Sequence, residues 1–195
     1  MVRDSRLVMG AKVRDGASEE DLIRQAVRGD AKAFGALYGL YHDAIYTYIY
    51  YRTGRTTTAE DLTENVFLKA WRAMGSYARG GLRFSSWLYR IAQNVVIDHY
   101  RTRKHHLPLG SEAAALAQEQ DAGPEELMLM SEEVKELQYA ISLLSVDEQQ
   151  VIVLRFVEGL SHAQVAEIVG KTKEACRVIQ HRALAELSRL LNELE

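Results

Sequence analysis

The stretch FSSWLYRIAQNVVIDHYRTRK, residues 84–104, combines basic, amide and aromatic side chains at helical spacing. Apolar residues mark one buried face, and Ser85 or Ser86 is expected to cap the start of the helix. The other face carries guanidinium, ammonium and amide groups, which suit phosphates and base edges. These residues are Arg90, Gln93, Asn94, Ile97, Arg101 and Lys104. The face indicates nucleic-acid binding; the competing interpretation is a solvated helix whose basic end offsets its own dipole.

A second nucleic-acid-binding pattern lies near the carboxyl end. Ser161 and Gln164 form a capping box for a helix over residues 162–169. Gly170 then supplies a left-handed turn before a second helix that continues to residue 191. Such a pair is a helix-turn-helix, whose second helix can enter the major groove. Residues expected at the DNA are Thr172, Lys173, Glu174, Arg177, Val178, His181 and Arg182. Similar helical hairpins also occur as structural scaffolds that bind no DNA. In that case Val178 would belong to a wider apolar core stripe of the second helix.

Charge is distributed unevenly along the chain. The 195 residues are 47% hydrophobic and 26% charged, with a net charge of -3, which is typical of a globular protein without a uniformly basic surface. Residues 83–104 are basic with Asp98 as their sole acid, whereas residues 112–136 are acidic with Lys135 as their sole base. Binding to a polyanion must therefore come from local patches.

Apolar spacing predicts helices throughout the chain, with glycines at several breaks. Ser18 and Asp21 form a capping box before the first helix. The expected helices span 19–28, 30–53, 58–74, 85–103, 127–144, 147–158, 162–169 and 173–191. The predicted fold class is all-α, with two small helical domains joined by a flexible acidic linker. The expected divisions are a flexible extension over 1–17, a domain over 18–106, the linker over 107–126 and a domain over 127–195.

Several classes of function find no support in the sequence. Cys176 is the only cysteine, so the chain can form neither an internal disulfide nor a cysteine-based zinc site. The histidines are scattered, and His105 and His106 lack the partners of a metal site. We expect no enzyme activity, no metal and no cofactor. No apolar run approaches the length of a membrane span and no signal peptide is visible, so we expect a cytoplasmic protein without membrane insertion.

Four segments, in this order, resemble bacterial RNA polymerase sigma factors of the extracytoplasmic-function (ECF) type in the sigma-70 family. They are ALYGLYHDAIYTYIYYR at 36–52, AEDLTENVFLKAW at 59–71, FSSWLYRIAQNVVIDHYRTR at 84–103 and VIVLRFVEGLSHAQVAEIVGKTKEACRVIQHRALAEL at 151–187. The resemblance implies a region 2 domain and a helix-turn-helix region 4 domain. It also implies three partners: core RNA polymerase, promoter DNA and an anti-sigma factor.

The resemblance assigns roles to particular residues of the second segment. It implies contact with the clamp helices of the largest polymerase subunit through Asp61, Leu62, Glu64, Leu68 and Lys69. Region 4 would meet the flap of the second-largest subunit. The family often has an acid where this chain has Asn65, so that one charge contact does not carry over.

The resemblance also divides promoter recognition between the two domains. Binding and melting of the -10 element would involve Tyr77, Arg83, Phe84, Arg90, Asn94 and Arg101. The alternative role for Phe84 is that of a core residue that anchors the start of the helix. The -35 element would be read by the helix from Lys173, but ACRVI replaces the commoner TVKSR, so the family's base preferences do not transfer. The competing function is a stand-alone helix-turn-helix regulator, which would bind duplex DNA without polymerase.

Overall fold

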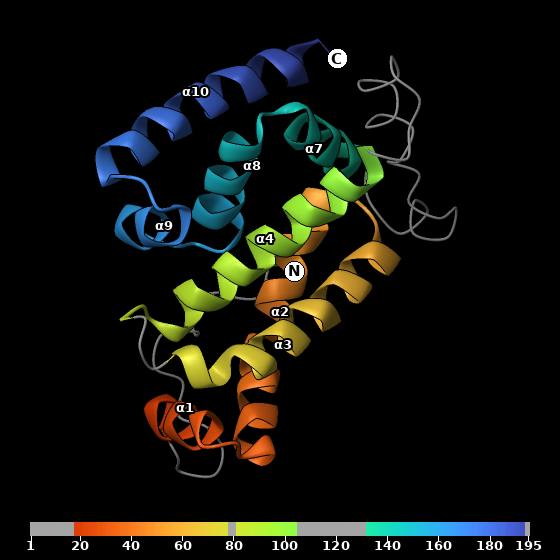
Figure 1. Ribbon diagram of the computed structural model, residues 1–195. Coiled ribbons are helices and arrows are strands. Elements are labelled where there is room, and N and C mark those ends of the chain that lie inside the picture. Colours follow the sequence, from red (N-terminus) through yellow and green to blue (C-terminus); the bar gives the residue numbers. More distant parts are fainter. Residues whose placement is uncertain (1–17, 78–80, 105–131, 194–195) are drawn as a thin grey trace.

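A computed structural model describes residues 18–77, 81–104 and 132–193, and within these ranges it contains helices and no strand (Figure 1). The helices are α1 (Glu19–Val27), α2 (Ala31–Thr53), α3 (Thr56–Tyr77), α4 (Phe84–Lys104), α7 (Glu132–Leu143), α8 (Val146–Ile152), the π-helical turn η2 (Val153–Val157), α9 (His162–Val169) and α10 (Lys173–Asn192). The all-α prediction is confirmed. The predicted extension 1–17, the linker 107–126, the histidines at 105 and 106 and the helix start at 127–131 lie outside the described residues.

Local sequence patterns account for most helix ends. Ser18 and Asp21 form the predicted capping box of α1, with the Asp21 N–H donating to the Ser18 hydroxyl at 3.2 Å. Asp30 caps α2 by accepting from the Lys32 N–H at 2.8 Å, and Gly54 ends that helix at a φ of 70°. These short-range contacts explain why the observed bounds lie close to the predicted ones.

The prediction that a serine caps α4 is wrong. The helix begins at Phe84, and the Trp87 N–H donates to the Arg83 carbonyl at 3.0 Å, so Ser85 and Ser86 lie inside the first turn. Ser86 is buried rather than exposed at a helix end. Because α4 begins at Phe84, the residue before the helix is Arg83, whose N–H donates to the Glu167 carboxylate of α9 at 3.2 Å.

The helix predicted over 147–158 changes its winding partway. After Ile152 it widens into η2, in which the Glu158 N–H donates to the Val153 carbonyl at 3.0 Å, five residues back. Val153 and Leu154 remain buried, while Phe156 is exposed. A π turn of this kind cannot be recognised from apolar spacing, because the extra residue shifts the period only locally.

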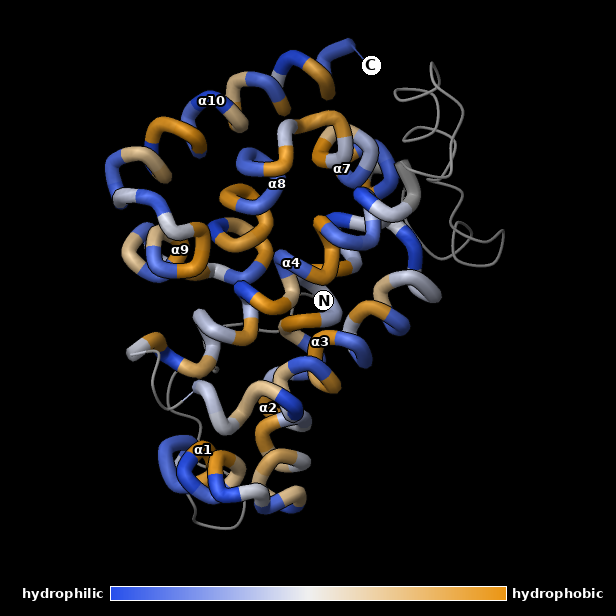
Figure 2. Tube along the Cα trace, in the orientation of Figure 1, coloured by the Kyte–Doolittle hydropathy of each residue, from blue (hydrophilic) through white to orange (hydrophobic). Residues whose placement is uncertain are grey.

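The amino-terminal unit (α1–α4) packs around long apolar side chains. Hydrophobic and hydrophilic residues alternate along its helices (Figure 2), as helical amphipathicity requires. Leu37 and Ile45 from α2, Val66 from α3 and Leu88 from α4 are fully buried at its centre. Burying one such side chain stabilises the fold by about 1.5 to 3 kcal/mol.

The carboxyl-terminal unit (α7–α10) holds the helix-turn-helix. Ser161 and Gln164 form the predicted capping box of α9, and Gly170 adopts the left-handed conformation at a φ of 70°. The core includes Val165 from α9 and Ala183 from α10, both fully buried. The predicted motif is therefore present, with α10 packed across α8 and α9.

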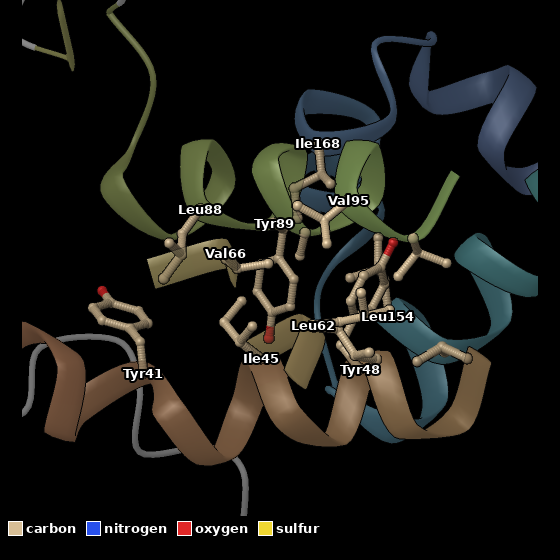
Figure 3. Close-up of a cluster of buried hydrophobic side chains, with 14 of the residues drawn as sticks. Tyr41, Ile45, Tyr48, Leu62, Val66, Leu88, Tyr89, Val95, Leu154 and Ile168 are labelled. Carbon is tan, nitrogen blue, oxygen red and sulfur yellow. The ribbon is translucent and has the colours of Figure 1, made fainter. Parts of the chain in front are cut away.

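The two units pack directly against each other and share one continuous core. Helix α4 contacts α9, while α2 contacts η2 and α7 (Figure 1). Tyr48 and Tyr89 from the first unit and Leu154 and Ile168 from the second belong to this buried cluster (Figure 3). Helix α4 thus contacts both units, packing on α2 and α3 within the first and on α9 of the second.

Candidate nucleic-acid and polymerase interfaces

The start of α10 presents its predicted DNA-contacting residues to solvent. The Thr172 hydroxyl caps the helix by accepting the Ala175 N–H at 3.1 Å. All seven residues predicted to face DNA are exposed: Thr172, Lys173, Glu174, Arg177, Val178, His181 and Arg182. Val178 is 50% exposed, so the alternative that placed it in the core stripe is wrong.

The opposite side of α10 is held in place by packing and by one arginine. Cys176 and Ala183 are fully buried against the unit core. From η2, the Arg155 Nε donates to Gln180 Oε1 of α10 at 3.2 Å, and the same guanidinium donates to the Leu160 carbonyl. Arg155 thus ties the turn before α9 to the exposed helix. Sequence analysis missed this positioning residue, because the partners are 25 residues apart.

The helix-turn-helix surface is electropositive at its tip. The pKa of His162 at the start of α9 is lowered, first by burial and then by the positive charge of Arg155, with Arg177 and Lys173 acting in the same direction. Burial disfavours any charge, but the positive charges of Arg155, Arg177 and Lys173 also attract an anion. The tip of α10 therefore suits a phosphate backbone.

The outer face of α3 carries most of the predicted polymerase-contacting residues. Asp61, Glu64, Leu68 and Lys69 are exposed, and the Lys69 ammonium lies 3.9 Å from the Asp98 carboxylate of α4. Leu68 is 49% exposed, so its side chain is accessible to a partner. Leu62 is only 8% exposed and belongs to the core, so its prediction as a surface contact is wrong.

An aromatic cluster supports the start of α4. Phe84 is 2% exposed, and its ring centroid lies 5.3 to 5.6 Å from those of Tyr41, Tyr77 and Trp87. The Tyr77 hydroxyl donates to the Leu82 carbonyl at 2.9 Å. The structure therefore favours the core alternative for Phe84, because a ring so enclosed has no face free for a base.

Other predicted -10 residues remain accessible along α4. Asn94 is exposed, and Arg101 is exposed while pairing with Asp98 at 3.0 Å on the helix surface. An exposed pair of this kind stabilises the fold little and leaves the guanidinium free to exchange partners. Asn94 and Arg101 thus lie on one open helix surface.

Arg83 and Arg90 instead contact the second unit. The Arg83 guanidinium donates to one carboxylate oxygen of Glu167 at 2.8 and 3.2 Å, and the Arg83 N–H donates to the other at 3.2 Å. Arg90 donates to the Glu167 carbonyl at 2.6 Å. Partial burial acts to raise the pKa of Glu167, but the hydrogen bonds from Arg83 outweigh it and hold that pKa below its usual value.

A buried carboxyl group also lies between the two units. Glu158, which follows η2, is 7% exposed, and its carboxylate accepts a hydrogen bond from the Tyr89 hydroxyl at 2.7 Å. Burial raises the pKa of Glu158 to about 7, and the hydrogen bond from Tyr89 offsets only part of that shift. Desolvation and the neighbouring Glu158 charge in turn raise the pKa of Tyr89 well above its usual value. Neither residue was singled out in the sequence.

Comparison with known proteins agrees with this geometry. The family model for Sigma-70 region 2 matches residues 37–106, and that for Sigma-70 region 4 matches residues 140–189. The ECF RNA polymerase sigma factor BldN of Streptomyces coelicolor is 40% identical over 177 residues, spanning 91% of this chain and 67% of BldN. The chain belongs to the ECF sigma factors.

A further relative of this sigma factor supports the same assignment, and a solved structure shares its fold. The ECF RNA polymerase sigma factor SigW of Bacillus subtilis is 31% identical over 180 residues, spanning 88% of this chain and 96% of SigW. Among solved structures, CnrH in complex with the cytosolic domain of CnrY aligns with a TM-score of 0.70 at 24% identity, covering 90% of this chain and 97% of CnrH. This membership makes the chain a transcription-initiation factor rather than a stand-alone regulator, and sigma factors as a family are not enzymes.

Within the described ranges, no three His, Cys, Asp or Glu side chains are grouped so that they could hold a metal ion. In the same part of the chain, no helix is both long and apolar enough to cross a membrane.

Proposed function

We propose that this sigma factor docks on core RNA polymerase through α3, binds and helps to melt the -10 element through α4, and reads the -35 element through α10. The observation that carries the proposal is the exposure of every predicted DNA-contacting residue on α10, together with the open polar face of α3. We propose domain boundaries at 18–106 and 127–195, with the segment 107–126 as linker. The proposed setting is the cytoplasm, without a catalytic activity or cofactor of its own.

The proposed -10 surface combines backbone clamps with one base contact. Arg83, Arg90 and Arg101 would hold phosphates, which fixes the position of the DNA without reading its sequence. Asn94 would contact an unstacked base or wedge the duplex, and Tyr77 would line the loop that receives that base. Phe84 supports Tyr77 in this arrangement, because the two rings pack edge to face.

Leu68 and Leu62 are expected to respond differently to substitution. Leu68→Asp places a charge on the proposed polymerase surface and should weaken binding to core polymerase about tenfold or more, with little change in stability. Leu62→Ala empties a core position and should lower the free energy of unfolding by about 2 to 5 kcal/mol. Titration with labelled core polymerase and urea denaturation measure the two effects. Unchanged polymerase binding by Leu68→Asp would remove α3 from the proposed interface.

Arg177→Ala tests whether α10 reads bases or only phosphates. A bidentate contact from Arg177 to a base should be worth about 1 to 3 kcal/mol, and its loss should relax specificity at one -35 position. The measurement is holoenzyme binding to a set of promoters with single substitutions in the -35 element. Arg182→Ala, on the same exposed helix, is the matched comparison. An equal loss of affinity on every sequence would make Arg177 a phosphate clamp.

Binding to core polymerase without DNA separates the proposal from its alternative. We expect the purified chain to co-purify with core polymerase and to bind duplex DNA weakly by itself, because its basic patches are small and its net charge is -3. Tight, sequence-specific duplex binding by the free chain without any affinity for polymerase would support a stand-alone regulator. We also propose that an anti-sigma factor controls this sigma factor, because family membership favours such a partner.

A further inference from the structure

A group of buried polar side chains lies among the helices through which the two units meet. Its members come from both units and are all buried: Tyr48 and Arg52 of α2, Tyr89 of α4, Gln150 of α8 and Glu158, which follows η2. Buried polar groups are costly unless they find partners, and the low local dielectric strengthens the effect of any charge among them. The contact between the units is therefore more sensitive to a change of charge than a purely apolar contact would be.

Glu158 is the acid of this group, and its hydrogen bond joins one unit to the other. The carboxylate accepts from the Tyr89 hydroxyl at 2.7 Å, although the two residues are 69 positions apart in the chain. The Tyr89 ring packs edge to face on the Tyr48 ring, with centroids 5.4 Å apart (Figure 3). Within the described residues, the Tyr89 hydroxyl is the one donor to the carboxylate. A carboxylate can accept several hydrogen bonds, so its charged form is incompletely satisfied here.

The arginine in this group and the arginine of the adjoining η2 have other partners. Arg52 donates to the Tyr48 hydroxyl at 2.7 Å. From η2, the Arg155 Nε donates to Gln180 of α10 at 3.2 Å. A buried carboxylate without a paired cation is strongly disfavoured relative to the neutral acid. The contact between the units therefore suits an uncharged Glu158.

The titration of Glu158 follows from this burial. Burial raises the pKa of Glu158 from 4.5 to about 7, and the hydrogen bond from Tyr89 offsets only part of the rise. When the units separate, water reaches the carboxyl group, and its pKa should return toward the ordinary value. Tyr89 of α4 and Tyr48 of α2 face this carboxyl group, and both have pKa values raised chiefly by burial, so they stay neutral. Of these three groups, Glu158 is the one that changes charge between pH 4.5 and about 7.

We propose that Glu158 is a proton-controlled latch between the two units: its neutral form favours their contact, and its charged form favours their separation. This latch requires no assignment of α4 or α10 to promoter DNA. By linkage, its contribution is complete below pH 4.5 and is lost as the pH rises to about 7. Contacts between domains of one chain commonly permit movement, so the titration shifts the population of molecules whose units are joined.

A second carboxyl group between the units titrates in the opposite sense. Partial burial acts to raise the pKa of Glu167 in α9, but the hydrogen bonds from Arg83 outweigh it and hold that pKa below 4.5. The contribution of Glu167 is present above pH 4.5 and is lost as the pH falls through its lowered pKa. The two groups together predict that the contact between the units is strongest at about pH 5 and weakens on either side.

Single-molecule energy transfer measures the joined and separated populations in the full chain. Dyes on Glu60→Cys of α3 and Ser188→Cys of α10 report the separation of the units, since both positions are exposed and the natural Cys176 is buried. Between pH 5.5 and pH 7.5, the ratio of joined to separated molecules should fall about tenfold. Circular dichroism at each pH shows whether the helices remain folded. A ratio that stays constant across this range in folded protein would overturn the inference.

Two variants test whether Glu158 is the group responsible. Glu158→Gln cannot ionise, so its ratio of joined to separated molecules should stay constant between pH 5.5 and pH 7.5. Tyr89→Phe removes the hydrogen bond that lowers the pKa of Glu158, so the fall in the ratio should move to higher pH. Glu174→Gln on the exposed start of α10 is the matched control and should behave like the parent. A fall that persists in Glu158→Gln, or that moves to lower pH in Tyr89→Phe, would overturn the latch.

Discussion

Replacing Phe84 with alanine should lower the free energy of unfolding by about 3 to 5 kcal/mol. The ring is 2% exposed and packs against Tyr41, Tyr77 and Trp87, so its loss leaves a cavity at the start of α4. Urea denaturation measures the effect. Transcription should fall equally on a duplex promoter and on one mismatched at the -10 element, because a misplaced α4 impairs every later step.

Asn94→Ala is the matched contrast, because Asn94 is exposed on the same helix. This variant should remain as stable as the parent and should lose activity mainly on duplex DNA. A mismatched -10 element removes most of the cost of unpairing, so it should restore much of that activity. Equal defects on both templates in folded Asn94→Ala would show that melting is assigned to the wrong residue. A stable Phe84→Ala protein whose transcription defect is confined to duplex DNA would instead indicate that Phe84 contacts the unpaired base.

Glu158→Gln should stabilise the protein above neutral pH and have little effect in acid. Burial raises the pKa of Glu158 from 4.5 to about 7, so the charged form is penalised in the folded state. The stability linked to this group is fully present below pH 4.5 and is lost as the pH rises to about 7. Removing the charge should raise the free energy of unfolding by about 1 to 3 kcal/mol at pH 8.

The groups around Glu158 decide how large this effect is. Tyr89 from α4 donates to its carboxylate. Burial is the main cause of the raised pKa of Tyr48 in α2, and the nearby Glu158 charge adds to that rise. Arg52 donates to the Tyr48 hydroxyl at 2.7 Å and opposes that shift. The glutamine keeps an acceptor for Tyr89 but leaves amide hydrogens to be satisfied, which limits the gain. Denaturation at pH 5 and pH 8, with exposed Glu174→Gln as control, measures the difference; an equal effect at both pH values would contradict the raised pKa.

Local patterns predicted the helices and the motif because their determinants lie within a few residues. Capping boxes at Ser18 and Ser161 and the left-handed Gly170 are formed by neighbouring groups, and the structure has them as predicted. The surface assignment of Leu62 was wrong because a helix face that meets a partner and one that meets the core have the same spacing. Whether the Leu62 side chain is buried or exposed depends on tertiary packing, which residue spacing does not reveal.

Contacts between the units could not be predicted from the sequence. Arg83 and Glu167 are 84 residues apart, and Tyr89 and Glu158 are 69 apart. Nothing in the local composition around these residues indicates their pairing, because each alone looks like a surface charge or an ordinary aromatic residue of a helix. The same pairing holds the residue before α4, since Glu167 also accepts the Arg83 N–H. Contacts between the units thus involve both the start of α4 and two arginines of the proposed -10 surface.

Reconstituted transcription tests the central claim most directly. Bacterial core RNA polymerase would transcribe fragments of the host genome with and without the purified chain, and sequencing would map the 5′ ends of the transcripts. The account predicts discrete start sites that appear only with the chain and share sequence elements near -10 and -35. Start sites that do not change when the chain is added, despite a folded protein and active polymerase, would contradict it.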